Sequence, residues 1–323
     1  MTTQIKHTEE RPLVAIHCMV YNHAPFLREC FEGFVMQKTT FPFIAIVHDD
    51  ASTDESADIL REYEVKYPHI FKPIYQTVNQ HSIPGVSVVQ TINKAIQETG
   101  AKYIAMCEGD DYWTDPLKLQ RQVDFLERNP KYSMSTENGL VIYKDGSSWN
   151  FSEKETREIS MEELLYQRQF PTASVLMRTE LLCDVYKIEG PKFDTFIWTY
   201  MSQKGKIHYQ NIVSSVYRRV DGVTERDKVK WAYMVELFNK NLYEKLNIPS
   251  YIIKQRNKVQ VLDFYYGYKV AKEQKNIKVA YELFLKCLHY DAFYLLKYIC
   301  INSRPYQQMV RLFSFQSFLI KSF

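Results

Sequence analysis

Short apolar runs alternate with helix-like patterns through the first half of the chain. Four continuous apolar runs predict buried strands: Leu13–Val20, Phe43–His48, Ile70–Tyr75 and Tyr103–Cys107. The segments between them have helical periodicity: Pro25–Val35, Ser52 to about Tyr67, and Gln90–Glu98. Strands that alternate with helices form β-α-β units, in which the strands run parallel. The pattern therefore predicts an α/β fold with a mainly parallel sheet.

Two helix starts carry specific predictions. Ser52 and Glu55 have the S-x-x-E spacing of a capping box, which predicts that they open the second helix. Thr114 is the expected N-cap of a further helix, from about Asp115 to Arg128, with proline in its first turn.

Beyond residue 130 the pattern is mixed. It predicts a strand at Leu140–Tyr143, helices at Met161–Tyr166 and Phe193–Lys204, and an extended segment at Ile207–Tyr217. After Thr224 nearly every segment has helical periodicity, so a C-terminal helical region is expected.

The C-terminal helical region is rich in aromatic, apolar and basic side chains, and two roles for it stay open. Its aromatic side chains can pack on the rest of the protein as a plain helical appendage. Alternatively, its last segment, Met309–Lys321, mixes large hydrophobic side chains with cations as membrane-surface helices do. The second role would give the protein a peripheral contact with a membrane.

Composition and charge are those of a soluble globular protein. The 323 residues are 46% hydrophobic and 24% charged, and a net charge of +3 is too small to indicate nucleic-acid binding by itself. The six cysteines include no C-x-x-C pair, so neither a zinc site nor a disulfide framework is expected. The sequence shows no secretion signal and no apolar run long enough to span a membrane. We expect a cytoplasmic protein with reduced thiols.

Acidic residues mark the ends of two predicted strands. Asp49 and Asp50 end the second strand, and Glu108, Asp110 and Asp111 follow the fourth. A polar turn before a helix explains either group alone. The carboxyl ends of parallel strands meet at one edge of a sheet, however, and ligands bind at that edge. Carboxylates suit Mg²⁺ or Mn²⁺, which bind phosphates, so a nucleotide diphosphate with its metal is the simplest shared ligand.

Competing sites lack their sequence signatures. An EF-hand loop that starts at Asp50 would need glycine where Glu55 stands and glutamate where Arg61 stands. The chain has no G-x-G-x-x-G after its first strand and no G-x-x-x-x-G-K-[ST], which argues against a Rossmann cofactor site and a P-loop. The scattered histidines are expected to be ordinary structural residues.

The ordered motifs resemble those of the family 2 glycosyltransferases with the GT-A fold. They are Val20–Asn22 at the end of the first strand, Asp49–Asp54 at the end of the second, Gly100–Trp113 around the fourth, and Asp115–Gln120 beyond it. The likeness covers roughly residues 13–222. It implies a Rossmann-like nucleotide-binding sheet, to which the C-terminal helical region would be an appendage, and a nucleotide-sugar donor, usually a UDP-sugar.

The resemblance also implies roles for residues near the donor. Tyr21 and Asp50 match positions that contact the uracil and the ribose. Met19 departs from the family pattern, in which proline is common before the Y-N pair. The donor-binding residues that we predict are Tyr21, Asn22, Asp49, Asp50, Glu108, Asp111, Arg218 and Arg219.

Glu108, Gly109 and Asp110 match the D-x-D element of the family, which implies a bound Mn²⁺ or Mg²⁺. Asp110 is the first expected metal ligand and Asp111 is the second. Glu108 departs from the pattern, because the family has aspartate at this position.

Glycosyl transfer with inversion needs a carboxylate that takes the proton from the attacking hydroxyl of the acceptor. Asp194 is our candidate for this catalytic base. Its spacing to Lys204–Ile207 resembles the family stretch in which an aspartate opens the helix behind the acceptor site. The alternative is an acidic residue that is favoured at a helix N-terminus by the helix dipole.

The segment Val216–Thr224 resembles the flexible loop that closes over the donor in this family. Arg218 or Arg219 is expected to pair with a phosphate, because guanidinium groups match phosphate oxygens. Val220 stands where the family often has histidine. The Q-x-x-R-W element of processive synthases is absent, so the resemblance implies that one sugar is added per encounter.

These predictions describe a metal-dependent inverting glycosyltransferase of bacterial surface-polysaccharide synthesis, with a glycan or lipid-linked acceptor, in the cytoplasm or on the inner face of the cell membrane. We expect a nucleotide-sugar-binding half (residues 1–130), an acceptor-binding half (131–224) and a C-terminal helical region (225–323). Two alternatives stay open: a catalytically silent protein that binds sugar nucleotides or glycans, and a nucleotidyltransferase. The latter would need a basic triphosphate-binding element near the first strand, and Tyr21–Ala24 provides none.

Overall fold

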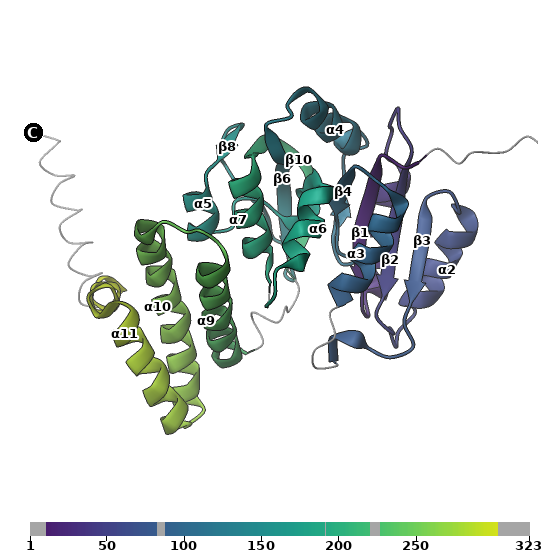
Figure 1. Cartoon of the computed structure of the whole chain (residues 1–323). Coiled ribbons are helices and arrows are strands. Elements are labelled where there is room, and N and C mark those ends of the chain that lie inside the picture. The colour runs from purple at the N-terminus through teal and green to yellow at the C-terminus, as the bar shows by residue number, and fades with distance from the viewer. Residues whose placement is uncertain (1–10, 83–87, 191, 220–226, 303–323) are drawn as a thin grey trace, which may run out of the picture. The chain divides into compact units, whose positions relative to one another are not determined.

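The computed structural model describes residues 11–82, 88–190, 192–219 and 227–302 (Figure 1). The chain divides into two compact units, residues 1–220 and residues 221–323. Two segments singled out in the sequence lie outside the described residues: Val220–Thr224 of the predicted donor-side loop, and Met309–Lys321.

One mixed sheet forms the centre of the first unit. Its strands are β1 (Val14–Val20), β2 (Phe43–Asp49), β3 (Phe71–Tyr75), β4 (Tyr103–Met106), β5 (Tyr112–Trp113), β6 (Tyr132–Tyr143), β7 (Ser148–Asn150), β8 (Arg157–Ile159), β9 (Leu176–Arg178) and β10 (Lys206–Arg219). They are ordered β3-β2-β1-β4-β9-β6-β10-β5, with β7 beside β6 and β8 beside β10. Strands β1 to β4 run parallel, and β9 is antiparallel to both its neighbours. The predicted α/β fold with a mainly parallel sheet is confirmed.

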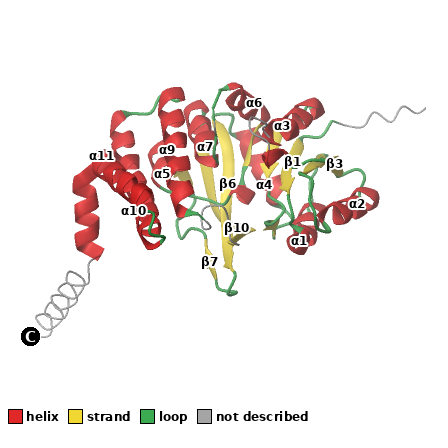
Figure 2. Cartoon of the chain, turned by 90° about the horizontal axis from the view of Figure 1, so that it is seen from below, coloured by secondary structure: helices red, strands yellow, loops and turns green. Residues whose placement is uncertain are grey.

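Helices cover both faces of this sheet. They are α1 (Ala24–Val35), α2 (Ser56–Lys66), α3 (Val88–Thr99), α4 (Lys118–Arg128), α5 (Met161–Tyr166), α6 (Thr179–Lys187) and α7 (Asp194–Lys204), with short 3-10 turns η1 (Gln80–Ser82) and η2 (Thr172–Ser174). Helices α1 and α2 lie on one face, and α3, α6 and α7 lie on the other (Figure 2). The sheet is therefore covered as in a doubly wound α/β protein.

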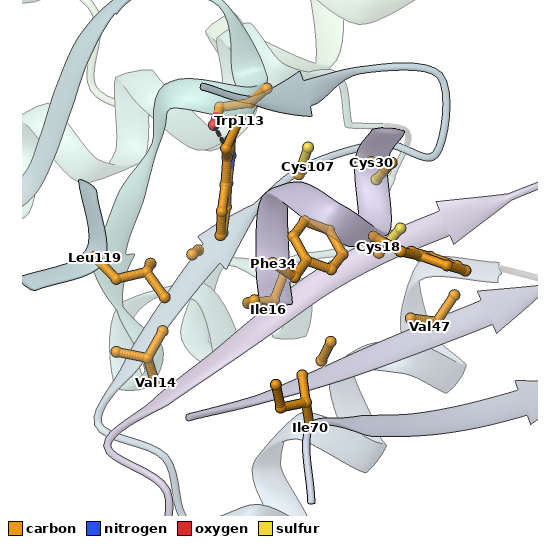
Figure 3. Close-up of a cluster of buried hydrophobic side chains, with 14 of the residues drawn as sticks. Val14, Ile16, Cys18, Cys30, Phe34, Val47, Ile70, Cys107, Trp113 and Leu119 are labelled. Carbon is orange, nitrogen blue, oxygen red and sulfur yellow. Dashed lines mark hydrogen bonds between the residues drawn. The ribbon is translucent and has the colours of Figure 1, made fainter. Parts of the chain in front are cut away.

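Alternate residues of β1 build the core beneath α1 (Figure 3). Val14 and Ile16 point to this face because side chains alternate along a strand, and each fully buried side chain of this kind stabilises the fold by about 1.5–3 kcal/mol. The ring of Phe34 in α1 lies 4.9 Å from that of Trp113 in β5. Gly33 permits this approach, since a Cβ there would lie 2.9 Å from the backbone nitrogen of Trp113. Helix α1 thus fixes the strand that follows the second acidic segment.

The capping-box prediction for Ser52 and Glu55 is wrong. Helix α2 begins at Ser56, and Glu55 makes no side-chain cap. The hydroxyl of Ser52 instead accepts the backbone N–H of Asn22 (3.0 Å), and that of Ser56 accepts the N–H of His23 (2.9 Å). Side chains of the β2–α2 loop and of the first residue of α2 thus satisfy donors at the start of α1, because the folded chain brings that helix start within reach.

The start of α4 also differs from the prediction. The helix begins at Lys118 rather than Asp115, and Thr114 is not its N-cap. The backbone N–H of Thr114 donates to the carbonyl of Ser214 in β10 (2.9 Å), and the Asp115 carboxylate accepts the N–H of Leu117 (2.8 Å). Pairing with a strand that lies distant in the sequence keeps Thr114 out of the helix, and Pro116 and Leu117 form a turn before it begins.

The strand predicted at Leu140–Tyr143 is the end of the longer β6. The first part of β6 is polar but buried, at Ser133, Ser135, Thr136, Glu137 and Asn138. Polar partners offset the cost of removing these groups from water. Arg121 pairs with Glu137 (2.7 Å), and the hydroxyls of Thr136 and Ser174 lie 2.6 Å apart. Helix α6 and strand β9 were not predicted at all.

The described part of the second unit contains three helices, α9 (Lys228–Lys245), α10 (Ser250–Glu273) and α11 (Ile277–Asn302). They pack around a separate apolar core that includes Ala232, Phe264 and Leu283. Helix α11 contains a kink at Asp291, whose carboxylate accepts the backbone N–H of Tyr294 (2.8 Å). The predicted C-terminal helices are confirmed. Across the described ranges, no helix has both the length and the apolar character needed to cross a membrane.

Candidate functional site

The two acidic segments lie on either side of the end of β1. Strand β1 pairs in parallel with both β2 and β4. The backbone N–H of Asp50 donates to the carbonyl of Val20 (2.9 Å), and that of Gly109 donates to the carbonyl of Met19 (3.0 Å). The sheet therefore brings the segments to one edge. That they share a ligand stays a prediction.

Asp50 holds the turn that follows β3. Its carboxylate accepts the backbone N–H groups of Gln80 (2.7 Å) and His81 (3.0 Å), and the residue is 4% exposed. Asp49 beside it is also buried, and its Oδ1 has no hydrogen-bond partner among the described residues. The predicted donor-binding aspartates thus lie at the sheet edge, with Asp50 engaged by backbone donors.

Tyr21 and Asn22 form the turn between β1 and α1. Tyr21 is 45% exposed, so part of its side chain is accessible to a ligand. Asn22 has a φ of 56°, and its side-chain oxygen accepts the backbone N–H of Thr53 (2.8 Å). Asn22 therefore links the turn to the loop after β2, while Tyr21 faces solvent.

The segment Glu108–Asp111 passes close to the start of α1. A Cβ at Gly109 would lie 2.8 Å from Nδ1 of His23 and 3.0 Å from a methyl group of Val20, so a larger residue does not fit without displacement. The glycine lets the acidic residues on either side approach β1 and α1 closely.

Burial and mutual repulsion destabilise the charges of this segment. Burial raises the pKa of Glu108 well above its usual range, and the charges of Asp110 and Asp194 raise it further. Burial also raises the pKa of Asp111, which is 2% exposed, and Asp110 adds to the effect. The backbone N–H of Arg218, 2.9 Å from Oδ1 of Asp111, offsets part of it.

Arg218 connects β10 to the acidic segment. Its guanidinium donates to the backbone carbonyl of Asp110 (2.7 Å), pairs with the carboxylate of Glu29, and lies 4.3 Å from the ring centre of Tyr112. Its side chain is 11% exposed. Arg218 is thus brought to the site, where its charge already has a partner.

Arg219 points elsewhere. Its guanidinium lies 5.5 Å from the ring centre of Tyr143 and 3.4 Å from the hydroxyl of the same residue. Contact of either arginine with a phosphate stays a prediction.

Asp194 is the first residue of α7, and its charge acts on the acidic segment. It contributes to the raised pKa of Glu108, and with burial it raises that of Tyr186. Its Oδ2 accepts a hydrogen bond from the hydroxyl of Thr172 (2.5 Å) and lies 3.8 Å from a guanidinium nitrogen of Arg168. The charge of the predicted base therefore acts on Glu108 in the predicted metal-binding loop.

Sequence reasoning missed three residues of this site: Glu29, Arg168 and Thr172. Each reaches it from another part of the chain; Glu29 is 189 residues from Arg218, and Thr172 is 22 residues from Asp194. None belongs to a motif of characteristic spacing, so the sequence contains no signal that would single them out.

Asp110 and Asp111 fit a site that a nucleotide completes. Within the described residues, no group of three or more His, Cys, Asp or Glu side chains could hold a metal ion. Mg²⁺ is usually held by one or two carboxylates together with substrate phosphates and waters. The raised pKa values of Glu108 and Asp111 follow first from burial and then from like charges. A divalent cation would relieve that repulsion, so the donor set fits one.

The sequence matches known glycosyltransferases. Residues 16–185 match the model of the family described as Glycosyl transferase family 2. An uncharacterized protein of Mycobacterium tuberculosis is 33% identical over 214 residues, which are 64% of this chain and 58% of that protein. The chain thus spans less than two thirds of the length of this relative. The putative teichuronic acid biosynthesis glycosyltransferase TuaG of Bacillus subtilis is 25% identical over 231 residues, which cover 70% of this chain and 86% of TuaG.

Solved structures match the fold. S. aureus TarS 1-349 in complex with UDP-GlcNAc aligns with a TM-score of 0.58 and 14% identity, over 86% of this chain and 79% of that one. The mannosyltransferase PcManGT of Pyrobaculum calidifontis, in complex with GDP-Man and Mn²⁺, aligns with a TM-score of 0.55 and 14% identity, over 97% of this chain and 86% of that one. These matches confirm the GT-A fold. With the family model covering half of its length, the chain belongs to glycosyl transferase family 2.

Proposed function

We propose that this protein transfers a sugar, with inversion, from a nucleotide-diphosphate donor to a glycan or lipid-linked acceptor. The observation that carries the proposal is the arrangement of carboxylates at one site. Burial and neighbouring like charges raise the pKa of Glu108 and of Asp111, and the charges of Arg168 and Arg218 offset only part of this effect at Asp111. The charge of Asp194, at the start of α7, acts on Glu108. A donor that arrives with its metal fits this excess of negative charge.

The donor would lie along the sheet edge. Tyr21 would stack on the base, and Asn22, Asp49 and Asp50 would shape the pocket for base and ribose, as the family match implies. A UDP-sugar is our proposed donor, which is in keeping with the UDP-GlcNAc complex of TarS. The GDP-Man complex of PcManGT represents the competing nucleotide.

Asp110, with Asp111 as second ligand, would hold Mn²⁺ or Mg²⁺ against the diphosphate. When bound, the cation would neutralise the charge that develops on the departing diphosphate. The buried carboxylate of Glu108 would lie beside it, and Arg218 or Arg219 would pair with phosphate oxygens.

Asp194 would act as the catalytic base. It would accept the proton of the acceptor hydroxyl while the oxygen attacks the anomeric carbon from the side opposite the diphosphate. This direction of attack inverts the configuration at that carbon. Because the sequence lacks the Q-x-x-R-W element of processive synthases, one sugar would be added per encounter.

The relatives support a role in bacterial surface polysaccharides. TuaG is described as a putative teichuronic acid biosynthesis glycosyltransferase, and a poly(ribitol-phosphate) beta-glucosyltransferase of Bacillus spizizenii is 35% identical over 102 residues. A cytoplasmic enzyme that contacts the membrane through its C-terminal region would meet a lipid-linked acceptor. Deletion of Pro305–Phe323 tests that contact, because an unchanged share of protein in the membrane fraction would contradict it.

A screen of thermal stability with nucleotide-sugars tests the proposed donor. We expect UDP-sugars to raise the melting temperature with Mn²⁺ or Mg²⁺ and to lose most of this effect with EDTA, because ligands that bind only the folded state stabilise it. Release of UDP with candidate glycan acceptors then measures transfer. Stabilisation without turnover on any acceptor would favour the silent binding protein, and the absence of any metal-dependent stabilisation would contradict the proposed donor site.

A further inference from the structure

Three residues form a directed chain of polar contacts that ends at Asp194. A guanidinium nitrogen of Arg168 donates to Oγ1 of Thr172 (2.9 Å), and this hydroxyl donates to Oδ2 of Asp194 (2.5 Å). The direction is fixed because arginine has donors only, so the hydroxyl accepts from Arg168 and gives its own hydrogen to the carboxylate. A distance of 2.5 Å is typical of a charge-assisted O–H···O⁻ bond.

The middle residue of this chain is fixed by the fold. Thr172 begins η2 and is 6% exposed, while the Asp194 side chain that it contacts is 43% exposed. The backbone carbonyl of Ala173 accepts the indole N–H of Trp113 (2.7 Å). The hydroxyl of Ser174 bonds Thr136 of β6 (2.6 Å). The turn η2 is therefore tied both to β6 and to the strand that directly follows the acidic segment.

The cation at the head of the chain is also held in place. The guanidinium of Arg168 lies 5.1 Å from the ring centre of Tyr217 and 5.9 Å from that of Phe151. Its charge is one of those that counter the effect of burial on the pKa of Asp111. The charged and titratable groups around Asp194 are thus Arg168 on one side and Glu108 and Tyr186 on the other.

We propose that Thr172 and Arg168 are positioning residues for the catalytic base, which hold Asp194 oriented through its Oδ2. This inference rests on the proposed function. Both polar contacts of the carboxylate in the described structure fall on Oδ2, so Oδ1 is the oxygen that would receive the proton. The acceptor oxygen forms its bond to the anomeric carbon, and the bond from that carbon to the diphosphate breaks, with its electron pair leaving on the diphosphate.

Thr172→Val tests the hydroxyl, because valine keeps the shape and removes the hydrogen bond. We expect kcat to fall about tenfold, which is the scale of one hydrogen bond to a charged group, with the KM for the donor unchanged within about twofold. The pH profile of kcat/KM is a second readout, which a merely structural role of Thr172 would leave unchanged and which we expect to differ from that of the parent. Thr172→Ser keeps the hydroxyl and should restore both.

A matched control lies on the same helix as the base. Thr199 in α7 is buried, and its hydroxyl donates to the backbone carbonyl of Thr195 (2.6 Å) rather than to Asp194. Thr199→Val makes the same chemical change without touching the chain of contacts. We expect it to keep the kcat and the pH profile of the parent.

The outcomes separate this inference from the proposed function. If Thr172→Val keeps the kcat and pH profile of the parent while Asp194→Asn loses turnover, the positioning role is overturned and the base stands. If Asp194→Asn keeps turnover, the base assignment itself fails. Should Thr172→Val not fold, Arg168→Gln replaces it, because Arg168 is 45% exposed and tolerates exchange better. A parent-like pH profile of that variant overturns the inference equally.

Discussion

The two groups of carboxylates at the site differ in what compensates their charge. Asp194 has a hydroxyl donor and an arginine of its own, and its side chain is 43% exposed. Glu108 and Asp111 are packed beside Asp110, and burial raises the pKa of each. The one side chain cation that reaches their backbone, Arg218, is paired with another carboxylate in the described structure.

This difference indicates which half of the site is complete. Asp194 is oriented by groups of the protein itself, as a base must be before the acceptor arrives. The acidic segment is electrostatically unsatisfied until a cation binds, because buried charges are costly unless they are paired or coordinate a metal. The comparison therefore predicts separate consequences for changes on the two sides.

Asp194→Asn should give the largest effect. Asparagine keeps the size and the acceptor for Thr172 but cannot take a proton, so kcat should fall by about 10²–10⁴, the usual contribution of general base catalysis. Binding of UDP-sugar and the melting temperature should stay close to those of the parent. Asp184→Asn is the matched control, since Asp184 pairs with Lys187 on the surface of α6. Turnover at the parental rate in Asp194→Asn would show that Asp194 is not the catalytic base.

Asp110→Asn should act on the other side of the site, on binding. We expect the metal-dependent affinity for a UDP-sugar to fall at least tenfold, because one of two carboxylate ligands loses its charge. Titration calorimetry with Mn²⁺ and with EDTA measures the difference. Asp58→Asn on the exposed surface of α2 is the control. If the variant and the parent respond to EDTA alike, the acidic segment is not the metal site.

Asp111→Asn should stabilise the protein when no metal is present. The raised pKa of Asp111 means that its ionised form costs stability at neutral pH, and that stability increases as the pH falls toward the raised value. Asparagine keeps an oxygen for the N–H of Arg218 and removes the charge. We expect a gain of about 1–2 kcal/mol in urea unfolding with EDTA, and a smaller gain or a loss with Mn²⁺ and UDP. A metal-free variant that is less stable than the parent would contradict the comparison.

The sequence predicted the part of the site that lies at the ends of strands β1 to β4. The apolar runs of β1 to β4 are nearly continuous, and the acidic residues stand directly at strand ends, so strand order alone placed them at one edge. The neighbouring half was less predictable because its strands bury polar residues. Glu137 in β6 is fully buried against Arg121, and such a pair has no hydrophobic signal.

Contacts between distant segments explain the remaining errors. Ser52 has the spacing of a capping box, but the fold turns it toward Asn22 at the start of another helix. In the same way, the partners of Asp194 come from elsewhere in the chain: Arg168 from the loop before η2 and Thr172 from η2 itself. Hydrogen bonds between segments that meet only after folding leave no pattern along the chain.

The smallest predicted effect concerns His17, on the face of β1 opposite to Val14 and Ile16. Its protonation changes stability with pH in the opposite direction to that of Asp111. His17 is 2% exposed, and burial lowers its pKa to about 4, with the nearby His48 adding to the effect. Between about pH 6.5 and 4 the unfolded chain binds a proton there that the folded protein does not, so stability is lost as the pH falls. His17→Leu should remove about 1 kcal/mol of the loss between pH 7 and 5.5 in urea unfolding with EDTA. Protonation of Asp111 changes stability in the other direction, so the two single variants and the double variant separate the contributions of the two residues. If the slope of the unfolding free energy against pH is unchanged in His17→Leu, His17 is already charged in the folded protein.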